Sequence, residues 1–345
     1  MKILHYYPAF LPNVGGLELN VANIAANIQR AGHEVTVVTT TPSSEPDRFP
    51  FRVVRRPSPR ELLRWARWCD LFFQANVSLR GLWPLLLVRR PWVVSHHSWY
   101  CRSDGRIAWQ DRLKRFLLRY AAASIAVSQA IADDLAVPSV VIPNPYRDWQ
   151  FRILPGVERV GELLFVGRLV SDKGADVLLE ALAILAREGI SARLTVVGRG
   201  PEEPRLREQA RRLGLADQVE LRGARTGEEL AEILNRHRVL VVPSRYREPF
   251  GIVALEGIAC GCLVVGSAGG GLAEAIGPCG RTFRNGDAAD LARVLGEVLL
   301  HPERDGDYLR HAEEHLAGHR AERVAAVYLH VLAEAIGRTA KRKAA

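Results

Sequence analysis

Short apolar runs alternate with helical stretches along almost the whole chain of 345 residues. Residues 2–7 and 34–40 have the composition of buried strands, and residues 17–31 between them carry apolar side chains at helical spacing. Such strand–helix–strand alternation predicts a parallel sheet with helices on both of its faces. Further strand-like runs of the first half lie at residues 92–95, 124–127 and 139–142.

The alternation stops once and then restarts. Residues 144–156 contain prolines and show no clear period, so we expect a linker there. Strand-like runs between residues 162 and 265 again alternate with helices, and residues 287–337 have a helical pattern. We therefore predict an α/β protein with two doubly wound Rossmann-like domains, at residues 1–155 and 156–318. A C-terminal helix over residues 319–345 is expected to return to the first domain.

Composition narrows the class of protein. The chain is too long for one core, and its apolar runs fall short of the roughly 18 residues that a membrane span needs. It enters strand-like sequence directly, with no signal-peptide cleavage pattern. Its 5 cysteines are odd in number and form no C-x-x-C pair, which disfavours a disulfide framework or a zinc site. These features predict a cytoplasmic protein.

Positive charge is concentrated in the first half. Residues 1–155 hold 20 Lys and Arg against 11 Asp and Glu, so the whole net charge of +9 lies there. This favours an anionic partner, such as a membrane surface, a phosphorylated substrate or nucleic acid, whereas the other interpretation is an Arg-rich surface that maintains solubility. The segments 60–68 and 112–120 are predicted amphipathic helices, which either lie on an anionic membrane leaflet or cover the first sheet.

The candidate site residues follow predicted strands, where open α/β sheets bind ligands. Gly15 and Gly16 precede a helix, so backbone amides there can approach an anion, although a Gly-Gly pair alone is more often only a turn. His97 follows the run at residues 92–95. Its imidazole can exchange hydrogen bonds with a sugar hydroxyl or simply pack against its neighbours.

Glycine-rich loops and two glutamates mark the second domain. In the segment 167–174, Arg168 and Lys173 suit a diphosphate, whereas the glycine spacing is not that of a Walker loop. In the segment 248–256, free amides at a helix start can bind phosphate oxygens, and Glu256 can accept hydrogen bonds from a ribose diol. The pair Gly198 and Gly200 lacks the third glycine of a dinucleotide fingerprint.

Together these segments resemble the family 4 retaining glycosyltransferases of the GT-B fold over essentially the whole chain. The segment 248–256 matches the E-x7-E element of that family, and Cys260-Gly261 follows it. The other matching segments, all in the order of the family, are residues 12–16, His97-Ser98, 142–144, 165–168 with Lys173-Gly174, and 197–201.

The resemblance implies two Rossmann-like domains that face each other across a cleft. It further implies transfer of a sugar from a UDP- or GDP-type nucleoside-diphosphate sugar to a hydroxyl, by front-face attack, with no metal, no other cofactor and no nucleic-acid partner. By position, Glu248 holds the donor sugar, His97 contacts it near the reacting carbon, and Glu256 binds the ribose. The diphosphate falls to Arg168 and Lys173, and the remaining donor contacts come from Gly15, Gly16, Gly167, Gly198, Phe250, Gly251, Ile252 and Val253.

The acceptor is less well defined. Similar bacterial enzymes imply a glycan or lipid-linked glycan of envelope polysaccharide synthesis, and peripheral association with the inner face of the cell membrane. Acceptor choice is expected in residues 43–63 and 99–112, which carry no motif, and departures from the family at Gly257-Ile258 leave the donor sugar open. The alternatives are a soluble small-molecule acceptor, a non-catalytic nucleotide-sugar-binding module, and an epimerase or phosphorylase of the same fold class.

Overall fold

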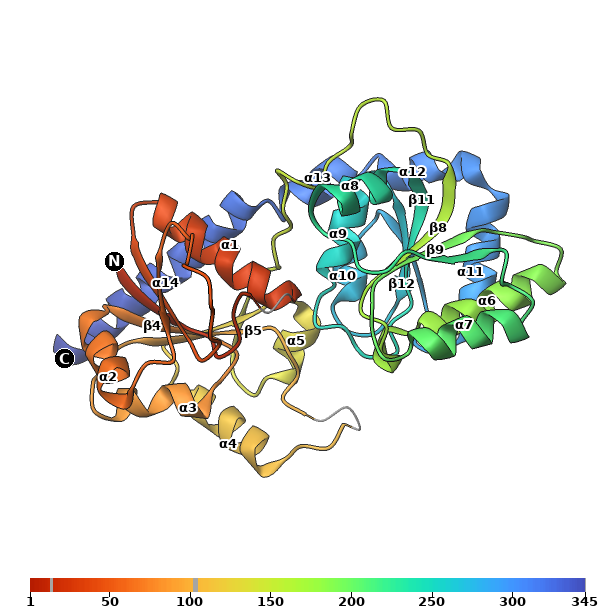
Figure 1. The fold of residues 1–345 in the computed structure, drawn as a ribbon. Coiled ribbons are helices and arrows are strands. Elements are labelled where there is room, and N and C mark those ends of the chain that lie inside the picture. The colour runs from red at the N-terminus through yellow and green to blue at the C-terminus, as the bar shows by residue number, and fades with distance from the viewer. Residues whose placement is uncertain (13–14, 102–104, 345) are drawn as a thin grey trace. The chain divides into compact units, whose positions relative to one another are not determined.

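A computed structural model describes residues 1–12, 15–101 and 105–344, and these fold into two compact units (Figure 1). The first unit consists of Met1–Pro145 and Ala321–Ala345, and the second of Tyr146–Arg320. Residues 146–155, which the sequence assigns to the first domain, belong to the second unit. Phe151 is buried there, and the N–H of Leu154 donates to Oδ1 of Asn235 at 2.8 Å.

Within the described residues, the first unit is built on seven parallel strands in the order β3-β2-β1-β4-β5-β6-β7. These strands are β1 (Lys2–Tyr6), β2 (Glu34–Thr39), β3 (Arg52–Arg55), β4 (Leu71–Ala75), β5 (Trp92–His96), β6 (Ala123–Ala126) and β7 (Val140–Val141). The helices are α1 (Gly16–Arg30), α2 (Pro59–Trp68), α3 (Leu79–Leu82), α4 (Trp109–Leu117), α5 (Gln129–Asp134) and α14 (Ala321–Ala344), with 3-10 turns η1 (Trp83–Leu86) and η2 (Leu118–Tyr120).

The core of the first unit lies on both faces of this sheet. Alternate residues of β1 point to opposite faces, so Ile3 packs beneath α1 and α14 while Leu4 packs against α2. From α14, Tyr328 and Leu332 are completely buried against the sheet. Figure 1 shows α14, at the blue end of the chain, running alongside α1. The C-terminal helix therefore supplies part of the core of the first unit.

The second unit has six parallel strands among its described residues, in the order β10-β9-β8-β11-β12-β13. These are β8 (Gly161–Val166), β9 (Leu194–Val197), β10 (Val219–Leu221), β11 (His237–Val242), β12 (Leu263–Ser267) and β13 (Gly280–Phe283). The helices and 3-10 turns are η3 (Ser171–Lys173), α6 (Ala175–Arg187), α7 (Glu203–Arg212), α8 (Gly227–Asn235), α9 (Ile252–Ala259), α10 (Leu272–Ile276), α11 (Ala288–Leu300), η4 (Pro302–Arg304), α12 (Asp305–Leu309) and α13 (Ala312–Ala317).

The two sheets confirm the predicted fold class, with Rossmann-like domains and a helical C-terminal region. Three strands were not predicted. β3 and β13 are only four residues long and each carries arginine, so their apolar pattern is weak. β4 is a short run directly after an amphipathic helix, yet every residue in it is buried. Among the described residues, no helix is both long and apolar enough to cross a membrane.

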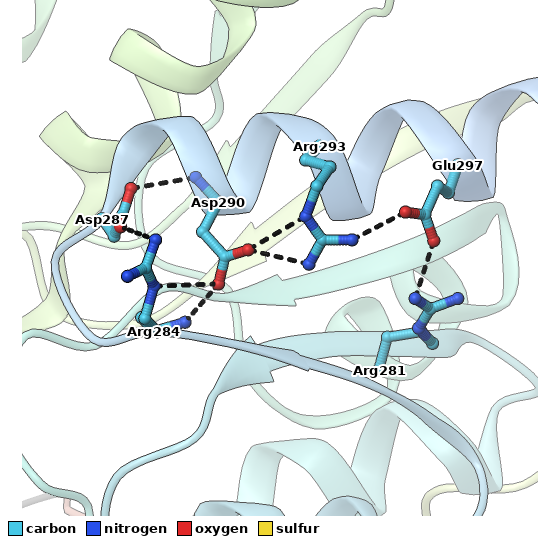
Figure 2. A network of polar contacts seen from close by, with 6 residues as sticks. All are labelled: Arg281, Arg284, Asp287, Asp290, Arg293 and Glu297. Atoms are coloured by element: carbon cyan, nitrogen blue, oxygen red, sulfur yellow. Dashed lines mark hydrogen bonds and ion pairs between the residues drawn. The ribbon is translucent and has the colours of Figure 1, made fainter.

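Charged side chains fasten the start of α11 to the loop after β13 (Figure 2). The Asp287 carboxylate accepts a hydrogen bond from the N–H of Asp290 at 2.9 Å, which caps the helix, and it also pairs with Arg284 at 2.8 Å. Further along α11, Arg293 bridges Asp290 and Glu297. Because these ion pairs are exposed, the cap is the stronger contribution to stability.

Replacing Asp287 should separate the cap from the ion pair. Asp287→Ala removes both and should cost about 1 kcal/mol of stability. Asp287→Asn keeps a capping oxygen and loses only the exposed ion pair, so its stability should stay close to that of the unaltered chain. Denaturant unfolding followed by circular dichroism measures both variants, and equal losses for the two would contradict the dominance of the cap.

Candidate functional site

The strand order of the second unit brings the loops after β8 and β11 together. β8 and β11 are neighbours in the sheet, while the chain continues from β8 to β9 on one side and from β11 to β12 on the other. Open α/β sheets bind ligands at the carboxyl ends of strands that flank such a reversal. The segments 167–174 and 243–251 follow these two strands, so the charged loops lie at this point.

Lys173 and Glu248 form an ion pair between these loops. Nζ of Lys173 lies 2.5 Å from Oε1 of Glu248, and the Ser244 hydroxyl donates to the same oxygen at 2.7 Å. Glu248 is only 8% exposed, so these donors replace the water that a carboxylate otherwise binds. Arg168, on the same loop as Lys173, is exposed. The structure therefore brings two of the expected catalytic side chains into contact.

The ion pair depends on a close backbone approach at Gly174. This residue has a φ of +67°, and a Cβ atom there would lie 1.9 Å from the carbonyl oxygen of Pro243. Only glycine fits such a position. Next to it, the N–H of Arg245 donates to the carbonyl of Asp172 at 2.9 Å. The loop after β8 is thus held directly against the loop after β11.

Gly167 and Gly198, both expected donor contacts, also lie side by side. A Cβ atom on Gly198 would lie 1.8 Å from the carbonyl oxygen of Gly167. The N–H of Gly167 donates to the carbonyl of Val197 at 3.0 Å, at the end of β9. The ends of β8 and β9 therefore present backbone with no side chain to keep a ligand away.

Asn285, which no sequence motif marks, connects the neighbouring loops. Its Oδ1 accepts a hydrogen bond from the N–H of Gly269 at 2.6 Å, and its Nδ2 donates to the carbonyl of Ser244 at 3.1 Å. The carbonyl of Glu248 accepts from the N–H of Gly271 at 2.7 Å. The loops after β11, β12 and β13 therefore support one another around Glu248.

The helix α9 begins at the end of the Glu248 loop. Gly251, with a φ of +107°, precedes its first turn, where Ile252 and Val253 are half-buried. Phe250 is buried, and its ring lies 5.8 Å from the ring of His319. This packing of Phe250 anchors the start of the helix. The first-turn N–H groups of a helix have no partners within it, and such groups attract anions.

Glu256 lies inside α9 and is only 8% exposed. Its Oε1 is 3.1 Å from Nη2 of Arg147, a residue that the sequence did not single out. Burial raises the pKa of the Glu256 carboxyl, and the charge and hydrogen bond of Arg147 act in the opposite direction. Both glutamates of the E-x7-E element are therefore buried beside a cation.

In the first unit, Gly15 caps α1 with extended backbone, and Gly16 is the first helical residue. Glu18, in the first turn, folds back over Gly15, so closely that a Cβ atom there would lie 2.3 Å from Oε2. A carboxylate thus occupies the helix start where the sequence predicted an anion site. Residues 13 and 14 of the expected loop, and residues 102–104 of the expected acceptor segment, lie outside the described residues.

His97 follows β5 and is buried (9% exposed). The backbone N–H of His97 donates to Oδ1 of Asn76 at 2.8 Å, and Nε2 of its ring lies 2.9 Å from Oγ of Ser95. Burial lowers the pKa of His97 to about 4, against the opposing effect of Asn144. His97 is therefore a neutral imidazole near pH 7.

Among residues 1–12, 15–101 and 105–344, no group of three or more His, Cys, Asp and Glu side chains is arranged to hold a metal ion. The sequence contains an Asp-x-Asp triplet at Asp305-Gly306-Asp307, and the structure places it on α12. Asp305 is engaged in an ion pair with Arg238 at 2.5 Å.

Comparisons with known proteins assign both units to one group of enzymes. Residues 14–147 match the family model described as glycosyltransferase family 4, and residues 150–315 match that of glycosyl transferases group 1. The structure is similar to the Anabaena protein HepE in complex with UDP, with a TM-score of 0.82 and 22% identity, covering 97% of this chain and 100% of that one. This likeness supports the GT-B fold that the sequence implied.

Two relatives show how far the sequence similarity extends. A D-inositol 3-phosphate glycosyltransferase of Catenulispora acidiphila is 40% identical over 166 residues, which cover 45% of this chain and 39% of the relative. A glycosyltransferase of unassigned substrate from Methanocaldococcus jannaschii is 30% identical over 311 residues, covering 76% of this chain and 79% of the relative. With family matches in both units and this long alignment, the chain belongs to the group 1 glycosyltransferases of family 4.

Proposed function

We propose that this glycosyltransferase moves a sugar, with retention at the anomeric carbon, from a UDP- or GDP-type donor to a hydroxyl of a glycan or lipid-linked glycan. The Lys173–Glu248 contact carries the proposal, because it sets a cation for the diphosphate beside a carboxylate for the donor sugar. The UDP held by the structurally similar HepE supports a nucleoside-diphosphate donor. The family match supports the reaction class.

Positive charge on the loop after β8 stabilises the leaving group. As the bond between the anomeric carbon and the diphosphate breaks, its electron pair moves onto the diphosphate. Lys173 and exposed Arg168 then stabilise the transition state more than the ground state. The backbone N–H groups at the start of α9 act in the same direction. In this proposal these cationic and dipolar groups neutralise the diphosphate without a metal ion.

Glu248 binds the donor sugar and is not a covalent nucleophile. Its Oε1 already accepts from Lys173 and Ser244, and we assign Oε2 to a sugar hydroxyl. A carboxylate so engaged is a weak nucleophile and a firm hydrogen-bond acceptor. Retention then arises from front-face attack, in which the acceptor oxygen bonds to the anomeric carbon from the side of the departing diphosphate. Neutral His97 contributes a hydrogen bond to the sugar and no positive charge.

The acceptor is proposed to lie at an anionic membrane, because α4 carries an uncovered apolar face. Trp109 is 68% exposed, Phe116 47% and Tyr120 69%, along α4 and the turn η2 that continues it. Arg112 and Arg119 are exposed on the same segment, which suits anionic lipid headgroups. Lys114 and Arg115, in contrast, pair with acidic side chains of the first unit.

The other predicted amphipathic helix, α2, covers the sheet instead. Leu62 and Ala66 are buried in the core, and Trp65 lies beneath the guanidinium of Arg52 at 5.1 Å. The apolar side chains Leu62, Trp65 and Ala66 of α2 are therefore engaged within the first unit. We assign membrane association, on the inner face of the cell membrane, to α4 alone.

Removing positive charge beside the diphosphate should slow turnover more than it weakens donor binding. We expect Arg168→Ala and Lys173→Ala each to lower kcat by more than they raise the donor KM, because charge grows on the leaving group. Rates of sugar transfer and of donor hydrolysis without acceptor measure both parameters. Full turnover by either variant at saturating donor would contradict its role at the leaving group.

Transfer should continue when metal ions are removed. Arg168, Lys173 and the amides of α9 supply the positive charge in this proposal, and Asp305 of the Asp-x-Asp triplet pairs with Arg238. We expect the same initial rate after dialysis against EDTA as before it. A rate that collapses and is restored by Mg²⁺ or Mn²⁺, but not by Na⁺, would show that a divalent cation is required.

Vesicle sedimentation tests the assignment of α4. Binding should require anionic lipid and weaken as salt rises from about 50 to about 500 mM, because salt screens the attraction. Combined Trp109→Ser and Phe116→Ser, or combined Arg112→Ser and Arg119→Ser, should reduce it. The matched control, Arg60→Ser with Arg64→Ser on α2, should bind as the unaltered chain does. Equal loss in the control would contradict the assignment to α4, and no binding to any vesicle would favour a soluble acceptor.

A further inference from the structure

Arg147 is the nearest cation to the carboxylate that we assign to the donor ribose. Its Nη2 lies 3.1 Å from Oε1 of Glu256, and both side chains are largely buried, at 23% and 11% exposure. The guanidinium also lies over the ring of Phe151, 4.8 Å from its centroid. Arg147 is therefore held on one side by an aromatic ring and on the other by Glu256.

Burial raises the pKa of the Glu256 carboxyl, and this contact opposes that effect. An isolated buried carboxyl favours its neutral form, and a neutral carboxyl has one oxygen that donates instead of accepting. Two ribose hydroxyls that donate one to each carboxyl oxygen are bound best by the ionised group. Arg147 supplies the opposite charge that makes ionisation less costly, and it approaches only Oε1.

We infer that Arg147 is a positioning residue for donor binding, which keeps Glu256 ionised and fixes its orientation toward the ribose. The inference rests on the proposed role of Glu256. With Oε1 bonded to Arg147, Oε2 and the remaining lone pair of Oε1 are directed to the diol. The opposite effect, in which Arg147 competes with the ribose, predicts tighter donor binding once the guanidinium is removed.

Other titratable groups lie near α9 and the Arg147–Glu256 pair. On the helix end itself, burial raises the pKa of the Cys260 thiol, and Cys262 and the charge of Glu256 raise it further. Of the helices packed on α9, α10 carries Glu274 and α13 carries Glu313, Glu314 and His315. His315 bonds to the carbonyl of Ala275 at 2.9 Å. The pKa of Glu256 is governed by burial and by Arg147.

Titration of Glu256 tests the inference without any ligand. The carboxyl resonance of Glu256, in protein labelled with ¹³C-glutamate, is the one that disappears in Glu256→Gln. We expect its titration midpoint to move up by about one pH unit or more in Arg147→Ala, which is a tenfold change in the ionisation equilibrium. Arg147→Lys should restore most of the shift. An unchanged midpoint in Arg147→Ala would overturn the inference.

Donor binding provides the second readout. Calorimetry with UDP-glucose between pH 5 and 9 should show Arg147→Ala binding about tenfold more weakly than the unaltered chain at the acidic end. This ratio should narrow as pH rises, because Glu256 ionises in both proteins. Arg152→Ala, an exposed arginine of the same segment, should match the unaltered chain. Tighter binding by Arg147→Ala would overturn the inference.

The two arms separate this inference from the proposed function. If the Glu256 midpoint moves in Arg147→Ala while Glu256→Gln binds UDP-glucose normally, Arg147 still controls the charge of Glu256. In that case Glu256 does not bind the ribose, and Arg147 does not position a donor contact. If the midpoint stays and Glu256→Gln loses binding, the proposed function stands and Arg147 has no part in it.

Discussion

The close approach of the loops after β8 and β11 determines most of what the second unit can do. These loops belong to different β/α units and meet only because the strand order reverses between β8 and β11. Gly174 allows the contact, since any side chain there would collide with the carbonyl of Pro243. The consequence is that Lys173 reaches Glu248, so a half-buried cation from one loop and a buried carboxylate from the other form an ion pair.

The two buried glutamates of this region each lie beside a cation. Glu248 has Lys173 as its partner and Glu256 has Arg147, so each buried carboxylate is matched by one cation. Exposed Arg168 then adds one positive charge with no such buried partner. A buried carboxylate without its cation is costly, and a diphosphate needs positive charge near it. In the proposed function, this pairing lets the same loops accept hydrogen bonds from sugar hydroxyls and attract the diphosphate.

Sequence predicted the fold class and the polar loops because both follow local patterns. Alternating apolar runs marked most strands, and Glu248 and Lys173 stood out on loops directly after them. Ser244, Asn285 and Arg147 were missed, since what they bond to depends on the register of segments far away in the chain. The local sequence patterns of α2 and α4 are also alike. The burial of Leu62, a residue of α2, in the core distinguishes the two helices.

The segments that connect the two units both contact the region around α9. Tyr146, where the chain enters the second unit, pairs with Arg320, where it leaves, and its N–H donates to the carbonyl of His319 at 3.2 Å. One residue further in, Arg147 bonds to Glu256, and the ring of His319 packs on Phe250. One connecting segment therefore contacts Glu256, at one end of the E-x7-E element. The other contacts Phe250, near the other end. In the proposed function, the donor ribose would contact Glu256, and Glu256 contacts Arg147 of the connecting segment.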